Sequence, residues 1–217
     1  LKNRGLNFSN EASAKKLLSD ISYYRLAGYW WPMQQDKVNH IFKNNSTFDD
    51  AVRLYNFDRE LRLLLFELIE CLEISLRSKL IYYLSHEKGP WWFEDSSNFK
   101  NPIAHQDCLI AIDRELQQSK EVFIKQHYVK YFTDTRRPPA WKSLEVSSFG
   151  TMSKVYSNLL PSIKSKDQIA RDFNTANQTF LPSWLLSISQ IRNICAHHQR
   201  LWNKNLPGKP KLLPKPP

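Results

Sequence analysis

The longest periodic stretch of the sequence follows Thr47. Apolar residues recur there at intervals of three and four positions, which is the spacing of one face of an α-helix. Thr47 also lies three positions before Asp50, a spacing typical of a capping box at a helix start. The stretch predicts one helix of about 36 residues that ends before Gly89 and Pro90 and forms the spine of a bundle. Its apolar stripe comprises Leu54, Phe57, Leu61, Leu64, Leu65, Leu68, Leu72, Leu76 and Leu80.

Shorter helices are predicted on both sides of this one. The first begins near Ser9 or Asn10, either of which can cap a helix, and its apolar stripe continues to Ile21. The last begins at Pro182, which suits the first helical position, and is predicted to continue to Trp202. The others cover residues 104–120, residues 122–131, residues 144–159 with an interruption at Gly150, and residues 166–173.

Two segments near the N-terminus have a different character. Residues 23–31 contain five aromatic side chains, which is more typical of a plug in a hydrophobic core than of a platform for stacked bases. Residues 36–46 are polar and are predicted to form a loop or a short ribbon.

The composition favours an all-α fold. The 217 residues include 5 glycines, and the dipeptides Asn-Gly and Asp-Gly, which mark tight hairpins, are absent. We expect three parts: an N-terminal helix with an aromatic-rich extension in residues 1–46, a helical domain in residues 47–202, and a basic, proline-rich tail in residues 203–217. The tail is expected to be an extended or disordered arm, because no acidic residue balances its lysines, which are Lys204, Lys209, Lys211 and Lys215.

The chain carries a formal net charge of +10 at pH 7, which attracts polyanions. Nucleic acid is the first candidate partner, although a basic protein without such a partner would carry the same charge. Arg136 and Arg137 form a local positive spot, and together with Lys204 they are candidate contacts to RNA.

The expected compartment follows from the cysteines and from the apolar run. Cys71, Cys108 and Cys195 match no metal or redox spacing, which favours reduced thiols and a cytoplasmic location. Charged residues interrupt the most apolar run, so no membrane-spanning helix is expected. The chain begins at Leu1 rather than at Met, so its native N-terminus is expected to be missing.

Functional groups are densest in the sequence RNICAHHQRLW, residues 192–202. On a helix, Asn193 and His197 would lie within roughly 40° of each other on one face. Arg192 and His197 would point about 140° apart. Either the Arg192 side chain swings back, or a second copy of the chain supplies the complementary group.

These groups suit metal-independent cleavage of RNA. An imidazole can take the proton of a ribose 2′-hydroxyl at neutral pH, a guanidinium can stabilise the charged transition state, and a carboxamide can orient the phosphate. Such a reaction leaves a 2′,3′-cyclic phosphate and does not occur on DNA. The alternative is an ordinary helix end, where cations are favoured by the helix dipole.

Neither a metal nor a cofactor is expected at this motif. His197 and His198 are neighbours and would diverge by about 100° on a helix. No cysteine or carboxylate lies at the spacing that a zinc site requires.

The chain resembles the Abi-like family of bacterial abortive-infection proteins, of the AbiD and AbiF type. The resemblance covers nearly the whole chain, and its stretches occur in the expected order. They are RGLNFSN, ISYYRLAGYW, FDRELRLLLFELIECLEISLRSKL, PPAWKSLEVSSFGTMSKVY and RNICAHHQRLWNK.

Proteins of this family resemble the HEPN superfamily of all-α domains. Members of that superfamily form dimers and often cut RNA through an Arg, four intervening residues and a His, with a polar residue after the Arg. Arg192, Asn193 and His197 match this pattern position by position. The resemblance therefore implies a HEPN-like helical bundle, a homodimer whose motifs face each other across the interface, and catalytic roles for these three residues.

The resemblance also marks residues that would support the site, namely Glu73, Arg77 and Glu145, and His198 is a further candidate because it adjoins His197. A carboxylate against Arg192 or His197 would orient that side chain. The alternative for Glu73 and Arg77, which are four positions apart, is an ordinary ion pair on a helix surface.

The implied function is an endoribonuclease of phage defence or a growth-arresting toxin. One alternative is a non-catalytic RNA-binding module, and its partner would be a small noncoding RNA, because some family members are encoded beside one. A further alternative is a protein-binding antitoxin or regulator whose positive charge binds an acidic partner protein.

Overall fold

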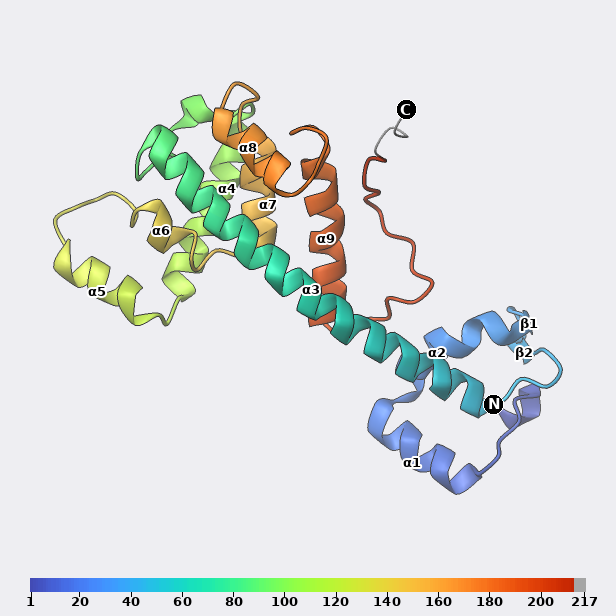
Figure 1. Cartoon of the computed structure of the whole chain (residues 1–217). Helices are drawn as coiled ribbons and strands as arrows, with labels where there is room; N and C mark the ends of the chain where they lie inside the picture. The colour runs from blue at the N-terminus through green and yellow to red at the C-terminus, as the bar shows by residue number, and fades with distance from the viewer. Residues whose placement is uncertain (213–217) are drawn as a thin grey trace. The chain divides into compact units, whose positions relative to one another are not determined.

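The computed structural model describes residues 1–212, and Lys215 of the predicted tail lies outside them (Figure 1). Nine α-helices and one antiparallel two-stranded ribbon occur in this range, which confirms the all-α fold and the short ribbon. The strands are β1 (Gln34–Asp36) and β2 (Ile41–Phe42). The helices are α1 (Glu11–Ile21), α2 (Tyr23–Trp30), α3 (Phe48–Lys88), α4 (Pro102–Gln118), α5 (Val122–Lys130), α6 (Ala140–Ser143), α7 (Phe149–Asn158), α8 (Lys164–Asp172) and α9 (Leu181–Ala196).

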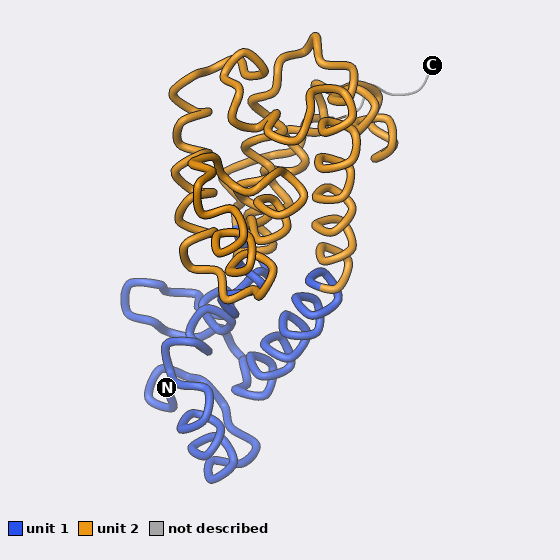
Figure 2. Tube along the Cα trace, turned by 90° about the vertical axis from the view of Figure 1, so that its left-hand side faces the viewer, with its two compact units in different colours: residues 1–66, 194–204 blue, residues 67–193, 205–217 orange. Residues whose placement is uncertain are grey.

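The chain divides into two compact units (Figure 2). The first unit comprises residues 1–66 and 194–204, and the second comprises residues 67–193 with the residues from 205 onward. Both α3 and α9 contribute residues to each unit. The boundary therefore falls inside two helices, where no change in composition or loop sequence marks it.

The start of α3 is fixed by the predicted capping box. The Asp50 amide donates to Thr47 Oγ1 at 3.0 Å, and the Thr47 amide donates to Asp50 Oδ2 at 3.2 Å. These bonds satisfy amide groups that have no partner within the helix. Gly89 follows the last helical residue at φ 87°, a left-handed conformation that glycine adopts without strain. The helix has 41 residues and is thus somewhat longer than predicted.

Each unit has its own hydrophobic core. In the second unit, Leu76, Leu80 and Leu84 of α3 are fully buried, and they pack in a cluster with residues of α4, α7, α8 and α9. In the first unit, the core contains residues of α1 and α2, the ribbon and the start of α3. The first-unit core residues are Leu6, Ala14, Leu26, Tyr29, Trp30, Phe42, Phe48 and Ala51.

The aromatic segment serves partly as the predicted plug. Tyr29 and Trp30 are buried in the first-unit core, whereas Tyr24 is 89% exposed. The predicted apolar stripe of α3 is also only partly buried, since Phe57 and Leu64 are each more than half exposed. Helical periodicity identified the helix correctly, but it did not show which apolar positions the core would cover.

Two helix boundaries differ from the prediction for local reasons. Gly150 does not interrupt a helix, because α7 begins just before it, where the Ser148 side chain accepts a hydrogen bond from the Thr151 amide at 3.3 Å. The last helix ends at Ala196 rather than at Trp202. The geometric argument that set Asn193 and His197 on one helical face therefore does not apply to His197.

Residues 205–212 of the tail belong to the second unit, where they are hydrogen-bonded to α9. The Gly208 amide donates to the Gln190 side chain at 3.1 Å, and Trp184 Nε1 donates to the Lys211 carbonyl at 2.9 Å. Residues 203–212 thus form no helix or strand, and this part of the tail is hydrogen-bonded to α9 rather than free.

No helix among residues 1–212 combines the length and the apolar character needed to cross a membrane.

Lys166 of α8 is a buried cation in the second unit, only 2% exposed. Its ammonium donates to the Leu159 carbonyl at 2.5 Å and lies 5.6 Å from the centre of the Tyr156 ring. Burial, with a smaller contribution from Lys100, lowers the pKa of Lys166 from 10.5 to about 7. The folded chain therefore releases this proton at a pH at which the unfolded chain still holds it.

This difference predicts a pH-dependent stability. The unfolded chain binds more protons than the folded chain between about pH 7 and pH 10.5, so the Lys166 contribution to the free energy of unfolding should rise with pH across that range. Lys166→Met should remove this rise, which urea unfolding at several pH values measures. Lys164→Met, at an exposed position on the same helix, is the control and should keep it. Parallel pH profiles for the wild type and Lys166→Met would contradict the prediction.

Candidate functional site

Arg192 of α9 lies against Glu73 of α3 in the second unit. The Arg192 Nε atom is 3.7 Å from Glu73 Oε2, a distance that allows an ion pair but not a hydrogen bond. This Nε atom is buried, and no residue in the described range accepts a hydrogen bond from it. Among the described residues, the Nε–H is therefore paired with Glu73 by charge alone, and the side chain as a whole remains 33% exposed.

Glu73 is itself held by Arg77. Arg77 Nη2 donates to Glu73 Oε1 and to the Ser147 carbonyl, each at 3.1 Å, and Arg77 Nε donates to the Leu144 carbonyl at 3.1 Å. One oxygen of Glu73 thus faces Arg77 and the other faces Arg192. The ordinary ion pair on α3 exists, and the same carboxylate also supports Arg192, so the two interpretations of Glu73 are compatible.

Glu145 is exposed and lies in a different setting. It lines a pocket of about 590 Å³ together with Glu115, Lys120 and Glu121. Arg192 and Glu73 are not among the residues that line this pocket. A supporting role for Glu145 at the motif stays a prediction.

The end of α9, which belongs to the first unit, is a Schellman turn. The Gln199 amide donates to the Ile194 carbonyl at 2.9 Å, and the His198 amide donates to the Cys195 carbonyl at 3.1 Å. His198 occupies the left-handed position of this turn, with φ 52°, where glycine is the commonest residue. The backbone of His198 therefore ends the helix, and both imidazoles are on exposed residues just beyond that end.

The chain after the turn is fixed by a buried carboxylate. Asp58 of α3 is fully buried, and its Oδ1 accepts hydrogen bonds from the Leu201 amide at 3.1 Å and from the Trp202 amide at 2.6 Å. Its Oδ2 accepts from Tyr29 Oη at 2.6 Å and from Arg62 Nη1. Four donors from three parts of the chain thus converge on one side chain.

The cost of burying Asp58 is offset by these donors. Arg62, which is 6% exposed, supplies the opposite charge, and Tyr29 supplies a neutral hydroxyl. Burial and the hydrogen bond to Asp58 raise the pKa of Tyr29 to about 12. The hydroxyl is therefore protonated at neutral pH and remains a donor to Asp58.

Two further arginines attach the turn to α2. Arg25 Nη1 donates to the His198 carbonyl at 2.8 Å, and Arg200 Nη1 donates to the Gly28 carbonyl at 2.5 Å. A Cβ atom at position 28 would come within 3.3 Å of the Arg200 side chain, so glycine permits this close approach. The segment from His198 to Trp202 is thus tied to both α2 and α3.

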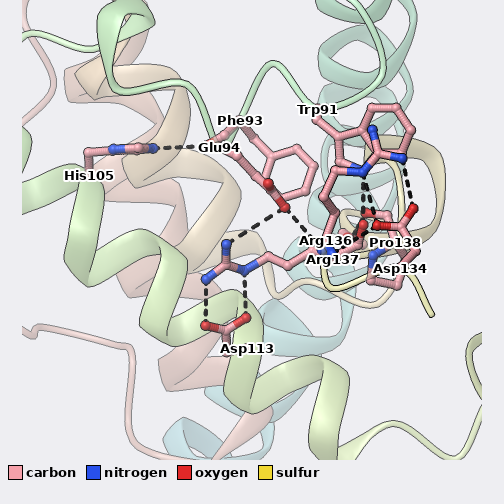
Figure 3. Close-up of polar contacts among 10 residues, drawn as sticks. Trp91, Phe93, Glu94, His105, Asp113, Asp134, Arg136, Arg137 and Pro138 are labelled. Carbon is pink, nitrogen blue, oxygen red and sulfur yellow. Dashed lines mark hydrogen bonds and ion pairs between the residues drawn. The ribbon is translucent and has the colours of Figure 1, made fainter. Parts of the chain in front are cut away.

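The predicted positive spot at Arg136 and Arg137 is largely paired within the second unit (Figure 3). Arg136 donates to Asp134 at 2.7 Å and stacks 3.7 Å from the centre of the Trp91 ring. Its hydrogen bonds lower the pKa of Asp134 to about 2. Arg137 donates to both oxygens of Asp113, at 2.6 and 2.7 Å.

Arg136 and Arg137 are therefore each paired with a carboxylate. Less positive charge is available to bind RNA at this turn than the sequence suggested. Lys204 is exposed and donates to the Gln199 side chain at 2.8 Å. RNA contacts at these three residues stay a prediction.

Among the predicted site residues, Arg192, Glu73 and Arg77 come together in the second unit. Asn193 is exposed in that unit, while His197 and His198 belong to the first. Sequence reasoning did not identify Asp58, Arg62 or the arginines that hold the turn. The four-residue spacing of Asp58 and Arg62 was a signal, but it also fits an ordinary pair on a helix surface.

Asp58→Ala should lower the free energy of unfolding by about 3–5 kcal/mol, because Arg62 would stay buried without its partner and two amides would lose their acceptor. Urea unfolding followed by tryptophan fluorescence measures this change. Glu60→Ala, at an exposed acid on the same helix, is the matched control and should cost less than about 0.5 kcal/mol. Equal losses for the two variants would show that Asp58 has no special role.

Comparison with known proteins agrees with the resemblance in the sequence. The Abi-like protein family matches residues 16–203, which is most of the chain. No significant match was found among curated proteins or among solved structures. The chain belongs to the Abi-like protein family, and this membership implies a role in abortive infection, a defence against phage.

Proposed function

We propose that the chain is a metal-independent endoribonuclease of the HEPN type that acts in abortive infection. The observation that carries the proposal is the state of Arg192. Its guanidinium is paired with the partly buried carboxylate of Glu73, while the Arg192 side chain stays 33% exposed. A guanidinium that is paired on its buried side and is otherwise partly exposed suits the binding of a phosphate.

The reaction follows from the chemistry of the three motif residues. His197 takes the proton of a ribose 2′-hydroxyl, and the 2′-oxygen attacks the neighbouring phosphorus. The bond from phosphorus to the 5′-oxygen breaks, and that oxygen takes a proton from a second imidazole or from water. Arg192 stabilises the charge on the phosphate oxygens, and Asn193 orients the phosphate. The products are a 2′,3′-cyclic phosphate and a 5′-hydroxyl.

Two features support this assignment of roles. His197 is exposed, so its imidazole is accessible to a large substrate such as RNA. The backbone on its C-terminal side is held by Arg25 and Asp58, so the imidazole stands on an ordered turn rather than on a frayed helix end. An ordered position is a requirement for a general base.

The homodimer is part of the same proposal. It would allow Arg192 of one copy to act with His197 of another. In α3, Phe57, Leu64 and Leu68 are each more than half exposed and are available to a second copy. Light scattering measures the mass of the protein in solution. A homodimer should have twice the chain mass of 25.6 kDa, and a monomer mass would contradict this part of the proposal.

The purified chain should cleave single-stranded RNA in the presence of EDTA, and His197→Ala should abolish the cleavage. Growth arrest on expression should be lost with the same substitution. Gel analysis of a labelled RNA measures the first result, and cell density measures the second. Cleavage by His197→Ala at the wild-type rate would sink the assignment, and salt-sensitive RNA binding without turnover in the wild type would favour the non-catalytic RNA-binding module.

A test of the role of His198 requires a substitution that removes the imidazole and keeps the backbone conformation. His198 already holds φ 52° with a Cβ atom, and alanine would keep that strain, whereas glycine adopts this conformation freely. His198→Gly therefore removes the second imidazole while leaving the turn in place. If His198→Gly cleaves RNA at the wild-type rate, His198 is not the proton donor. If its cleavage rate falls as far as that of His197→Ala, His198 is assigned as the donor.

A further inference from the structure

The first unit contains a pocket of about 750 Å³, which is within the range typical of small-molecule sites. All residues that line it belong to this one unit. They come from α1, α2, α3, the end of α9 and the turn that follows it, and they include three arginines, Arg25, Arg59 and Arg62, together with His198. None of the arginines is part of the motif in residues 192–197.

The positive charge of this pocket is only partly neutralised. Arg62 is paired with the buried Asp58. Within the described residues, by contrast, neither Arg25 nor Arg59 has a carboxylate at ion-pair distance, and Arg59 makes no hydrogen bond through its side chain. Arg25 uses one donor on the His198 carbonyl, and a guanidinium has five donors. The pocket therefore offers two exposed guanidiniums with donors available to an anion.

The lining also contains flat apolar surface. Tyr55 and Phe66 of α3 line the pocket, and the Phe66 side chain is 39% exposed. Tyr55 is supported from behind by an edge-on contact with Tyr29, whose ring centre is 5.5 Å away. Guanidiniums beside aromatic rings are the combination by which proteins hold single-stranded nucleic acid, through phosphates and stacked bases respectively.

We propose that this pocket binds one nucleotide of a single-stranded RNA, with its phosphate on Arg25 and Arg59 and its base against Phe66. The assignment rests on the proposed function only in taking RNA as the ligand. It adds a binding subsite on residues that the motif does not contain. Arg25 of the subsite also donates a hydrogen bond to the His198 carbonyl, so the same side chain contacts the turn that carries His197.

The test measures binding separately from cleavage. A fluorescently labelled 2′-O-methyl oligonucleotide cannot be cut through a 2′-hydroxyl, so its anisotropy reports binding alone. Arg59→Gln should weaken its affinity roughly tenfold. It should also reduce the slope of log affinity against log salt by about 0.7, the value for one phosphate contact on a single strand.

Two further variants should change the affinity for the oligonucleotide in opposite directions. Phe66→Ala should weaken binding by roughly fivefold or more, through the loss of a stacking surface. Asp20 is an acid in the lining of the pocket, so Asp20→Asn should tighten the binding of an anion. A weaker complex with Asp20→Asn would overturn the proposal.

The matched control is Arg53→Gln, which removes the same charge from the same helix outside the pocket. It should leave the salt slope unchanged, and equal effects of Arg53→Gln and Arg59→Gln would overturn the proposal. Adenosine monophosphate provides the second arm. If it binds as tightly as the oligonucleotide and depends equally on Arg59, the pocket is a site for a free nucleotide, and the assignment to an RNA strand fails.

Failure of this proposal is distinguishable from failure of the proposed function. Binding that depends on Arg59, without cleavage of unmodified RNA, would leave the pocket assigned and remove the nuclease. Cleavage that depends on His197, with oligonucleotide binding indifferent to Arg59, would do the reverse. Circular dichroism and thermal unfolding of each variant establish that it is folded.

Discussion

The first unit depends on the burial of one carboxylate. Asp58 is excluded from solvent, and an unpaired charge in that position would destabilise the fold strongly. The chain therefore has to deliver compensating donors to it, and it does so from α2, from α3 and from the backbone after α9. Because two of these donors are backbone amides, their positions do not depend on which side chains follow the helix. The buried charge fixes where the segment after the motif must lie.

The buried charge of Asp58 also helps to hold the backbone next to the candidate histidines, His197 and His198. A helix that simply frayed at Ala196 would leave His197 and His198 on a mobile end. The Schellman turn, the Arg25 contact and the two bonds to Asp58 instead hold the backbone on the C-terminal side of both histidines. In the second unit, Glu73 and Arg77 play the corresponding part for Arg192, since Arg77 is anchored on two backbone carbonyls and fixes the carboxylate. In the first unit a buried ion pair thus holds the backbone that follows the two candidate histidines, and in the second unit a partly buried ion pair lies against the candidate arginine.

The features that the sequence predicted well are those that depend on neighbouring residues. The capping box of Thr47 and Asp50, the cap at Asn10 and the glycine after α3 all follow from short-range hydrogen bonds. The end of α9 was missed because a histidine, His198, occupies the left-handed position of the Schellman turn where a glycine would have marked the helix end. The carboxylate that binds the amides after this turn lies more than a hundred positions earlier in the chain. Arg137 was expected to offer free charge because its partner, Asp113, lies 24 positions away. The partner of Arg136, Asp134, lies only two positions away and was overlooked in the sequence. The motif residues Arg192, Asn193 and His197 came from the family resemblance, and their spacing alone also fitted an ordinary helix end.

The most direct measurement concerns one phosphodiester bond. An RNA whose cleavage position has been mapped is compared, in EDTA, with the same RNA carrying a single 2′-deoxyribose on the 5′ side of that bond, and the fragments are identified by mass spectrometry. A nuclease that uses the ribose 2′-hydroxyl leaves a 2′,3′-cyclic phosphate and a 5′-hydroxyl on the unmodified strand and does not cut the modified bond. Continued cutting at the deoxyribose, or ends that carry a 3′-hydroxyl and a 5′-phosphate, would contradict this mechanism.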